Sequence, residues 1–543
     1  MLTQIANGDS RLSFWLRVRE FAVPPSMIET ATARRSTGDW AGACAAAGID
    51  VDFDLRSVAR AHGRELAARI RADLRHLAPD LLRWHMPRIA PDGLLRPGLT
   101  IALARYGGPG PEGDRQRDRP VHLVARTPPA WADAGQRISL ALWDGSHDVA
   151  AARRHPHIRP HRRFRLDLHR HLWDARRTGE LGVRSGAGPL LADGRPGAEP
   201  GPRSDLASGL AWDLASDLAR DLASDLARDL ASDLTSGLTS GLARDPLGRD
   251  PLGRDPLGRD PLARVPDGYR CAVDRWAAEA GILLRAESRA TGDRTGTGDR
   301  TGTRTVTVRL GGRQRLDLHL TPDPDGPGPP VLRIAPASGG GESSALPVLP
   351  DAATWVLPDL DLIRAGLIEA DRLHPLVASA LVPDRARAAV PRAGQERPGG
   401  PRPVECRGAR HRIGLVDGVL VPLDHDPAEI RREELLAALT GSPLACLRAI
   451  DEAHRRPHCL TGVRERLDHG DTAGALAVVE GLLGPGAVLR SGALLDELEA
   501  AARRRITYGL FRAGLAGPGH GRIGPGQRRP RNHRSHPRET TAR

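Results

Sequence analysis

The spacing of apolar residues predicts helices followed by short strands in the first 178 residues. Apolar positions recur near helical spacing at Leu55, Val58, Leu66, Ile70, Leu74 and Leu77. Three later segments have the length and alternation of strands, between turns rich in glycine and proline: residues 99–106, 121–125 and 137–143. Residues 163–169 also alternate strictly, so we expect a fourth strand there. Helices followed by a short meander indicate an α+β N-terminal domain over residues 1–178.

Residues 268–382 carry a similar but weaker pattern. The runs 304–310 and 315–320 flank a Gly-Gly pair, which is typical of a β-hairpin. We therefore expect a small α+β unit there, followed by a proline-rich linker over residues 383–403.

The C-terminal residues 404–515 predict one hairpin and then a mainly helical unit. The runs 411–416 and 419–421 flank Asp417-Gly418, a pair favoured in two-residue hairpin turns. Four or five short helices follow, with expected N-caps that include Asp426, Asp471 and Ser491.

A low-complexity insertion separates the first two units, over residues 179–267. Leucine recurs at every fourth position from Leu206 to Leu242, so its stripe drifts by about 40° per repeat on an ideal helix. A coiled coil needs a repeat of 3.5 residues, and the later repeats contain proline. The pattern therefore predicts a disordered linker, with a partner-binding segment as the alternative.

Composition changes the picture chiefly by what it excludes. All 79 basic residues are arginine, and this bias is typical of a high-GC bacterium. Without lysine the chain cannot form a Walker A loop, a protein-kinase site or a pyridoxal-phosphate Schiff base. Five scattered cysteines form no CxxC pair, and no run of residues is long and apolar enough for a membrane span. We expect a cytoplasmic protein with reduced thiols, no cofactor and no membrane contact.

Most of the net charge of +12 lies at the C-terminus, where eleven arginines stand against one glutamate between residues 503 and 543. Residues 516–543 are expected to be disordered. A nucleic acid or another polyanion would contact this tail at Arg522, Arg528, Arg529, Arg531, Arg534 and Arg538. The alternative is a terminus that only keeps the chain soluble. A G-x-G-x-x-G match at residues 519–524 has no flanking strand or helix and does not predict a dinucleotide site.

Three groups of residues resemble metal ligands. The first is His147, His155, His157, His161, His169 and His171. The second is Cys446, His454, His458 and Cys459, and the third is Asp50, Asp52 and Asp54. None has the spacing of a standard zinc motif, and Asp54 fits a helix N-cap after an edge strand. The sequence thus predicts no metal site and no identifiable catalytic residues.

One short phrase occurs twice, at Gly38–Ala43 and Gly470–Ala475, and loosely resembles the second helix of tetratricopeptide-type hairpins. No regular 34-residue period accompanies it, so a shared way of starting a helix is the favoured interpretation. We expect a non-enzymatic protein-interaction or adaptor protein. A nucleic-acid-associated protein acting through the tail, or a metal-dependent enzyme using a histidine or aspartate cluster, are the alternatives.

Overall fold

A computed structural model describes the chain in sixteen stretches and one single residue. They are residues 2–107, 120–132, 136–145, 155, 157–187, 270–291, 304–310, 314–321, 331–337, 346–383, 402–406, 408–416, 419–440, 445–455, 459–484, 488–489 and 491–516. Several small sheets and many helices make the fold α+β, as the sequence predicts. The predicted insertion lies outside these residues from 188 onward.

The N-terminal part consists of helices packed against a four-stranded sheet. The helices are α1 (Leu2–Phe21), α2 (Pro25–Ser36), α3 (Trp40–Ala46), α4 (Leu55–His62), α5 (Arg64–His76) and α6 (Pro79–His85). The sheet has the order β1 (Ile49–Val51), β6 (Ile138–Trp143), β5 (Val121–Arg126) and β4 (Thr100–Tyr106). Strands β4 to β6 pair antiparallel and confirm the predicted meander, while β1 joins the edge of β6 in parallel. A two-stranded ladder, β2 (Arg88–Ile89) with β3 (Leu94–Leu95), and the short helix η1 (Ala130–Ala132) complete this part.

The fourth strand expected at residues 163–169 is wrong. This segment is instead a series of tight turns, closed by hydrogen bonds from Leu168 N to Arg165 O and from His169 N to Leu166 O. Its alternation has a different cause, because its arginines pair with carboxylates while Phe164 and Leu166 enter the core. A short helix follows, η2 (Arg170–Leu172).

One hydrophobic core spans segments that are far apart in the sequence. Helix α8 (Glu180–Ser185) lies inside the predicted insertion, yet its Leu181 is buried in the N-terminal core. Helices α14 (Pro358–Arg364) and α15 (Pro375–Leu381), with the short helix η5 (Ala370–Arg372) between them, add Leu360, Leu362 and Val377 to the same core. The bounds of independent folding units therefore stay a prediction.

The central unit has its own core. Strands β7 (Arg304–Arg309), β8 (Arg315–Thr321) and β9 (Val331–Pro336) form an antiparallel sheet, which confirms the predicted hairpin. Helix α12 (Val273–Thr291) and helix α13 (Asp351–Thr354) pack with this sheet around the buried Trp276.

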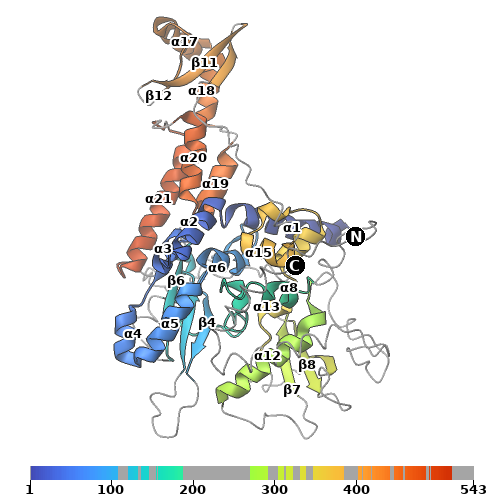
Figure 1. The fold of residues 1–543 in the computed structure, drawn as a ribbon. Helices are drawn as coiled ribbons and strands as arrows, with labels where there is room; N and C mark the ends of the chain where they lie inside the picture. The colour runs from blue at the N-terminus through green and yellow to red at the C-terminus, as the bar shows by residue number, and fades with distance from the viewer. Residues whose placement is uncertain are drawn as a thin grey trace, which may run out of the picture.

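The C-terminal helices stand on the N-terminal body and carry a projecting module (Figure 1). The supporting helices are α19 (Leu460–His469), α20 (Thr472–Leu483) and α21 (Ala493–Arg512). The projecting module consists of β10 (Arg402–Cys406), β11 (Ala409–Val416), β12 (Val419–Pro422), α17 (Pro427–Thr440) and α18 (Ala445–Arg455). The predicted hairpin is confirmed as β11 and β12, with Val416 opposite Val419.

His469 anchors the supporting helices in the body. Its ring is buried and stacks on Phe21 at 6.4 Å, and its carbonyl oxygen accepts a hydrogen bond of 2.8 Å from Arg83 Nη2. Burial, reinforced by the nearby Arg88 and Arg83, lowers the pKa of His469 to about 3. The imidazole is therefore neutral at this junction.

The repeated Gly-Asp-x-Ala-Gly-Ala phrase forms the same helix start twice. Asp39 and Asp471 each accept a hydrogen bond of 2.8 Å, from Gly42 N and Gly474 N respectively. A Cβ atom at either glycine would lie 2.1 Å from the aspartate oxygen, which explains the second glycine of the phrase. The N-cap expected at Ser491 is wrong, because Gly492 occupies that position without a side-chain cap. Across the described residues, none of the helices is both long and apolar enough to cross a membrane.

Candidate functional site

A cavity of about 140 Å³ lies where the N-terminal helices, the turn segment 163–172 and the central unit meet. Its apolar wall includes the rings of Trp15, Trp84, Phe164 and Trp355. This volume is close to that of a cavity that holds one benzene molecule. The cavity therefore has room for a small ring compound between aromatic faces.

Eight arginines line this cavity, and most of them are paired with carboxylates. They are Arg11, Arg19, Arg88, Arg96, Arg163, Arg165, Arg184 and Arg275. The ion pairs of five of them are Arg11–Asp361, Arg19–Asp359, Arg163–Asp351, Arg165–Asp167 and Arg184–Glu279, at 2.6 to 2.8 Å. These five arginines hold the wall together and are not free for a ligand.

Arg275 differs from those five. It lies on α12, is partly buried, and its side chain forms no ion pair or hydrogen bond with another described residue. The charges of Asp274 and Glu279 act on it without forming an ion pair, so its five donors can bind an anion. Arg275 is therefore the cation of this wall that a ligand could reach most directly.

Two histidines add polar groups without partners. The Nε2 atom of His85 and the Nδ1 atom of His171 are buried, and neither has a hydrogen-bond partner in the described part of the chain. Both residues line the cavity. A buried polar atom without a partner costs about 1–3 kcal/mol, so such atoms usually mark a place where a ligand or water binds.

The pKa values of both histidines are lowered first by burial and then by a neighbouring arginine. Burial, then Arg19, lowers the pKa of His85 well below its ordinary value. Burial and Arg184 do the same to His171. Both imidazoles are therefore neutral, and each offers one donor and one acceptor to a bound molecule. The charges of Arg19 and Arg184 favour an anion nearby, whereas burial opposes a charge of either sign.

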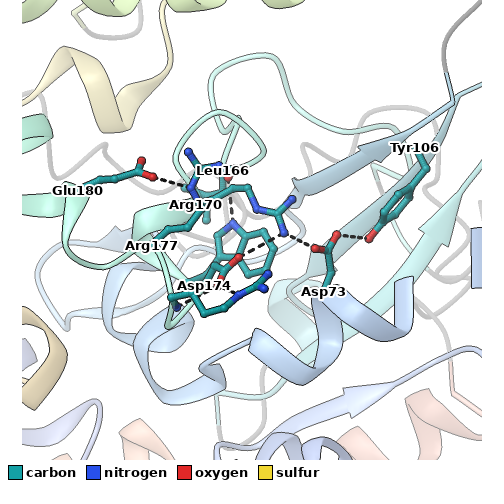
Figure 2. A network of polar contacts seen from close by, with 9 residues as sticks. Asp73, Tyr106, Leu166, Arg170, Asp174, Arg177 and Glu180 are labelled. Carbon is teal, nitrogen blue, oxygen red and sulfur yellow. Dashed lines mark hydrogen bonds and ion pairs between the residues drawn. The ribbon is translucent and has the colours of Figure 1, made fainter. Parts of the chain in front are cut away.

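A polar network fixes the segment that carries His171 (Figure 2). Asp73 accepts a hydrogen bond of 2.7 Å from Tyr106 and a second one from Arg170. Arg170 also reaches Asp174 at 3.4 Å, and its guanidinium lies 4.7 Å from the ring centroid of Trp173. Because every member is engaged, we assign this network to structure and not to chemistry.

No family model, curated protein or solved structure matches this chain.

His374 and Asp80 form the arrangement most similar to an acid–base pair. His374 Nε2 lies 3.0 Å from Asp80 Oδ2, and both side chains are 1% exposed. His374 Nδ1 accepts the backbone N–H of Leu376, so neither ring nitrogen is available to a substrate. The pair joins α15 to α6.

The predicted histidine cluster does not form a metal site within the described residues. His155 Nε2 contacts Thr127 O, His161 Nδ1 accepts from Arg163 N, and His169 Nδ1 contacts Arg165 O. His147 lies outside the described residues, and the backbone of His157 donates to His155 Nδ1 and accepts from Thr100 Oγ1. Of the cluster, only His171 lines the cavity.

The three aspartates after Gly48 are also engaged separately. Asp50 pairs with Arg137 and Tyr508, while Asp52 pairs with Arg512. Asp54 caps α4 by accepting from Ser57 N at 2.9 Å, which confirms the N-cap prediction. The aspartates thus join the sheet edge to α21 and cap a helix, and they do not converge on a cation.

The second predicted ligand set is divided by the fold. Cys446 meets Cys406 and His425 in the projecting module, and Cys459 lies elsewhere, before α19. The side chain of His454, the whole of His458 and the arginines of the tail lie outside the described residues. Sequence reasoning did not single out Cys406, His85 or Arg275, because each is a single polar residue within an ordinary local run; it considered His425 only beside Asp424 and Asp426, as a resemblance to an acid–base pair.

Proposed function

We propose that this protein binds a small organic carboxylate with a planar apolar part in the arginine-lined cavity. The observation that supports this most strongly is the unpaired guanidinium of Arg275 at a wall with two buried, unpartnered histidine nitrogens. The carboxylate of the ligand would bind the guanidinium of Arg275, and the apolar part would lie against Trp15, Trp84 or Trp355. The described residues include no activated nucleophile at this wall, so the proposed role is binding and not turnover.

Benzoate is a suitable probe because its ring matches the cavity volume and its carboxylate matches the guanidinium. Isothermal titration should show saturable binding of benzoate and much weaker binding of the neutral benzamide. Arg275→Gln should weaken benzoate binding by roughly tenfold or more, the equivalent of one lost charge-assisted hydrogen bond. Since Arg275 forms no ion pair with another described residue, this substitution breaks none.

Arg289→Gln is the matched control, because Arg289 lies on the same helix, is exposed and does not line the cavity. It should bind benzoate as the unaltered chain does. Equal losses in both variants, or benzamide binding as tightly as benzoate, would count against the proposal.

The protein-interaction or adaptor role is the second candidate, and the projecting module favours it. The module stands away from the body (Figure 1) and exposes Val416, Leu423 and Leu435, the last to 68%. Single exposed apolar side chains are common, but three on one small projection are a reasonable contact surface. A Leu435→Ser and Val416→Ser double variant should lose a partner that the unaltered chain captures from lysate. Capture of the same proteins by the double variant and by the unaltered chain would refute this role.

A further inference from the structure

Two cysteines and one histidine converge inside the projecting module. Cys406 ends β10, His425 follows β12, and Cys446 lies in the first turn of α18. The two Sγ atoms and a ring nitrogen of His425 all lie within 4.8 Å of one another. Cys406 and Cys446 are 40 residues apart in the sequence. The fold nevertheless brings two sulfur atoms and one ring nitrogen close together.

The spacing of these atoms fits a tetrahedral metal site. Zinc binds sulfur at about 2.3 Å and imidazole nitrogen at about 2.0–2.1 Å, so the tetrahedral angle places the two ligand atoms about 3.6 Å apart. The Sγ atom of Cys446 lies 3.5 Å from Nε2 of His425. Thiolate and imidazole ligands also favour zinc over magnesium or calcium, which prefer oxygen ligands.

The surroundings of His425 orient its ring toward the thiols. The ring stacks on His411 with centroids 4.1 Å apart and planes 15° from parallel. Its other nitrogen, Nδ1, lies 3.6 Å from a carboxylate oxygen of Glu429. A carboxylate behind a metal-binding histidine is a frequent outer partner, because it fixes the tautomer and raises the basicity of the ligand nitrogen.

The two thiols of the site are buried. Cys406 is 1% exposed and Cys446 is fully buried. Where the side chains of residues 402–455 are described, Ile413, Pro422 and Ile450 are buried beside them. Natural folding units of this small size often add a metal or a disulfide to their core.

We propose that Cys406, His425 and Cys446 bind one zinc ion that holds the projecting module together. Both thiols release their protons on binding, and the two thiolates balance the charge of the ion. The fourth position is left to a water molecule. The ring of His411 stacks on His425 beside this site. Its buried Nδ1 has no hydrogen-bond partner among the described residues.

The test uses the full chain, purified without chelators and analysed for metals. We expect about one zinc ion per chain, and its near-complete loss in Cys406→Ser, Cys446→Ser and His425→Ala. Cys459→Ser is the matched control, since this thiol lies close in sequence but outside the cluster, and it should keep the ion. Glu429→Gln should weaken zinc binding by roughly tenfold.

A second measurement separates loss of the ligand from loss of the fold. The module contains no tryptophan, so tryptophan fluorescence reports on the body alone and should not change in the cysteine variants. Cobalt substituted for zinc in the unaltered chain should show the intense ultraviolet absorption of thiolate–cobalt bonds. Absence of that absorption, absence of zinc after reconstitution, equal loss of zinc in Cys459→Ser, or a Cys406–Cys446 disulfide in the purified chain would each overturn the proposal.

Discussion

The buried ion pair between Arg19 and Asp359 offers a sharp test of how this chain is held together. Asp359 is fully buried, accepts a hydrogen bond of 2.7 Å from Arg19, and accepts a second one of 3.1 Å from Trp84 Nε1. The guanidinium lies between two indoles, with ring centroids at 5.4 Å for Trp15 and 4.4 Å for Trp84. This pair connects α1 and α6 to α14, across some 340 residues of sequence.

Asp359→Asn keeps an oxygen acceptor for Trp84 but removes the charge opposite Arg19. Arg19 is only 3% exposed, so solvent cannot replace the lost carboxylate. Removing one partner of a buried pair costs about 3–5 kcal/mol, and the lower limit corresponds to roughly a 150-fold shift in the folding equilibrium. Denaturant unfolding followed by tryptophan fluorescence measures this directly, because two indoles flank the pair.

Two comparison variants separate charge burial from ordinary pairing. Glu499→Gln breaks an exposed pair with Arg503, in which the side chains are 52% and 74% exposed, and should cost less than about 0.5 kcal/mol. The double variant Arg19→Met with Asp359→Leu should recover most of the loss, since apolar residues of similar size often replace a buried pair without penalty. A loss below about 1 kcal/mol in Asp359→Asn would refute the reasoning.

Three further predictions concern the C-terminal part of the chain. Because the pKa of His469 is lowered to about 3, the unfolded chain gains a proton below pH 6.5 that the folded chain does not. The free energy of unfolding should therefore fall as the pH drops from 7 to 5. His469→Leu should reduce this pH dependence by up to about 1.4 kcal/mol per pH unit, and an unchanged pH dependence would contradict the prediction. Gly474→Ala should cost about 1 kcal/mol in thermal unfolding, because its Cβ would displace the Asp471 cap. Gly462→Ala should instead stabilise α19 by up to about 1 kcal/mol, because no heavy atom lies within 4 Å of the added Cβ. If both substitutions changed the stability in the same direction, the cap mechanism would be contradicted. Deleting residues 516–543 should abolish retention on DNA or RNA if the tail binds polyanions, and retention by the shortened chain rejects that role.

Local patterns in the sequence predicted much of the secondary structure. The alternation at residues 121–125 and 137–143 became β5 and β6, because adjacent strands need only a short connection to pair. The caps at Asp54, Asp426 and Asp471 depend on atoms within three residues, so sequence spacing suffices to find them.

The prediction was wrong where a distant partner decides the local structure. Alternation at residues 163–169 suggested a strand, but the ion pair of Arg163 with Asp351 and turn hydrogen bonds outweigh that tendency. The edge strand expected before the Asp54 cap is confirmed as β1, but its parallel pairing with β6 could not be predicted from local sequence.

The sequence by itself determined the α+β class, the hairpins, the helix starts and the absence of lysine chemistry, because these depend on residue type and on neighbours within one turn. Tertiary structure alone decided which polar residues meet. Arg275, His85 and His171 line one cavity, and Cys406 approaches Cys446, because separate elements pack against one another. Such convergence costs chain entropy that only the assembled core offsets, and no local spacing records it.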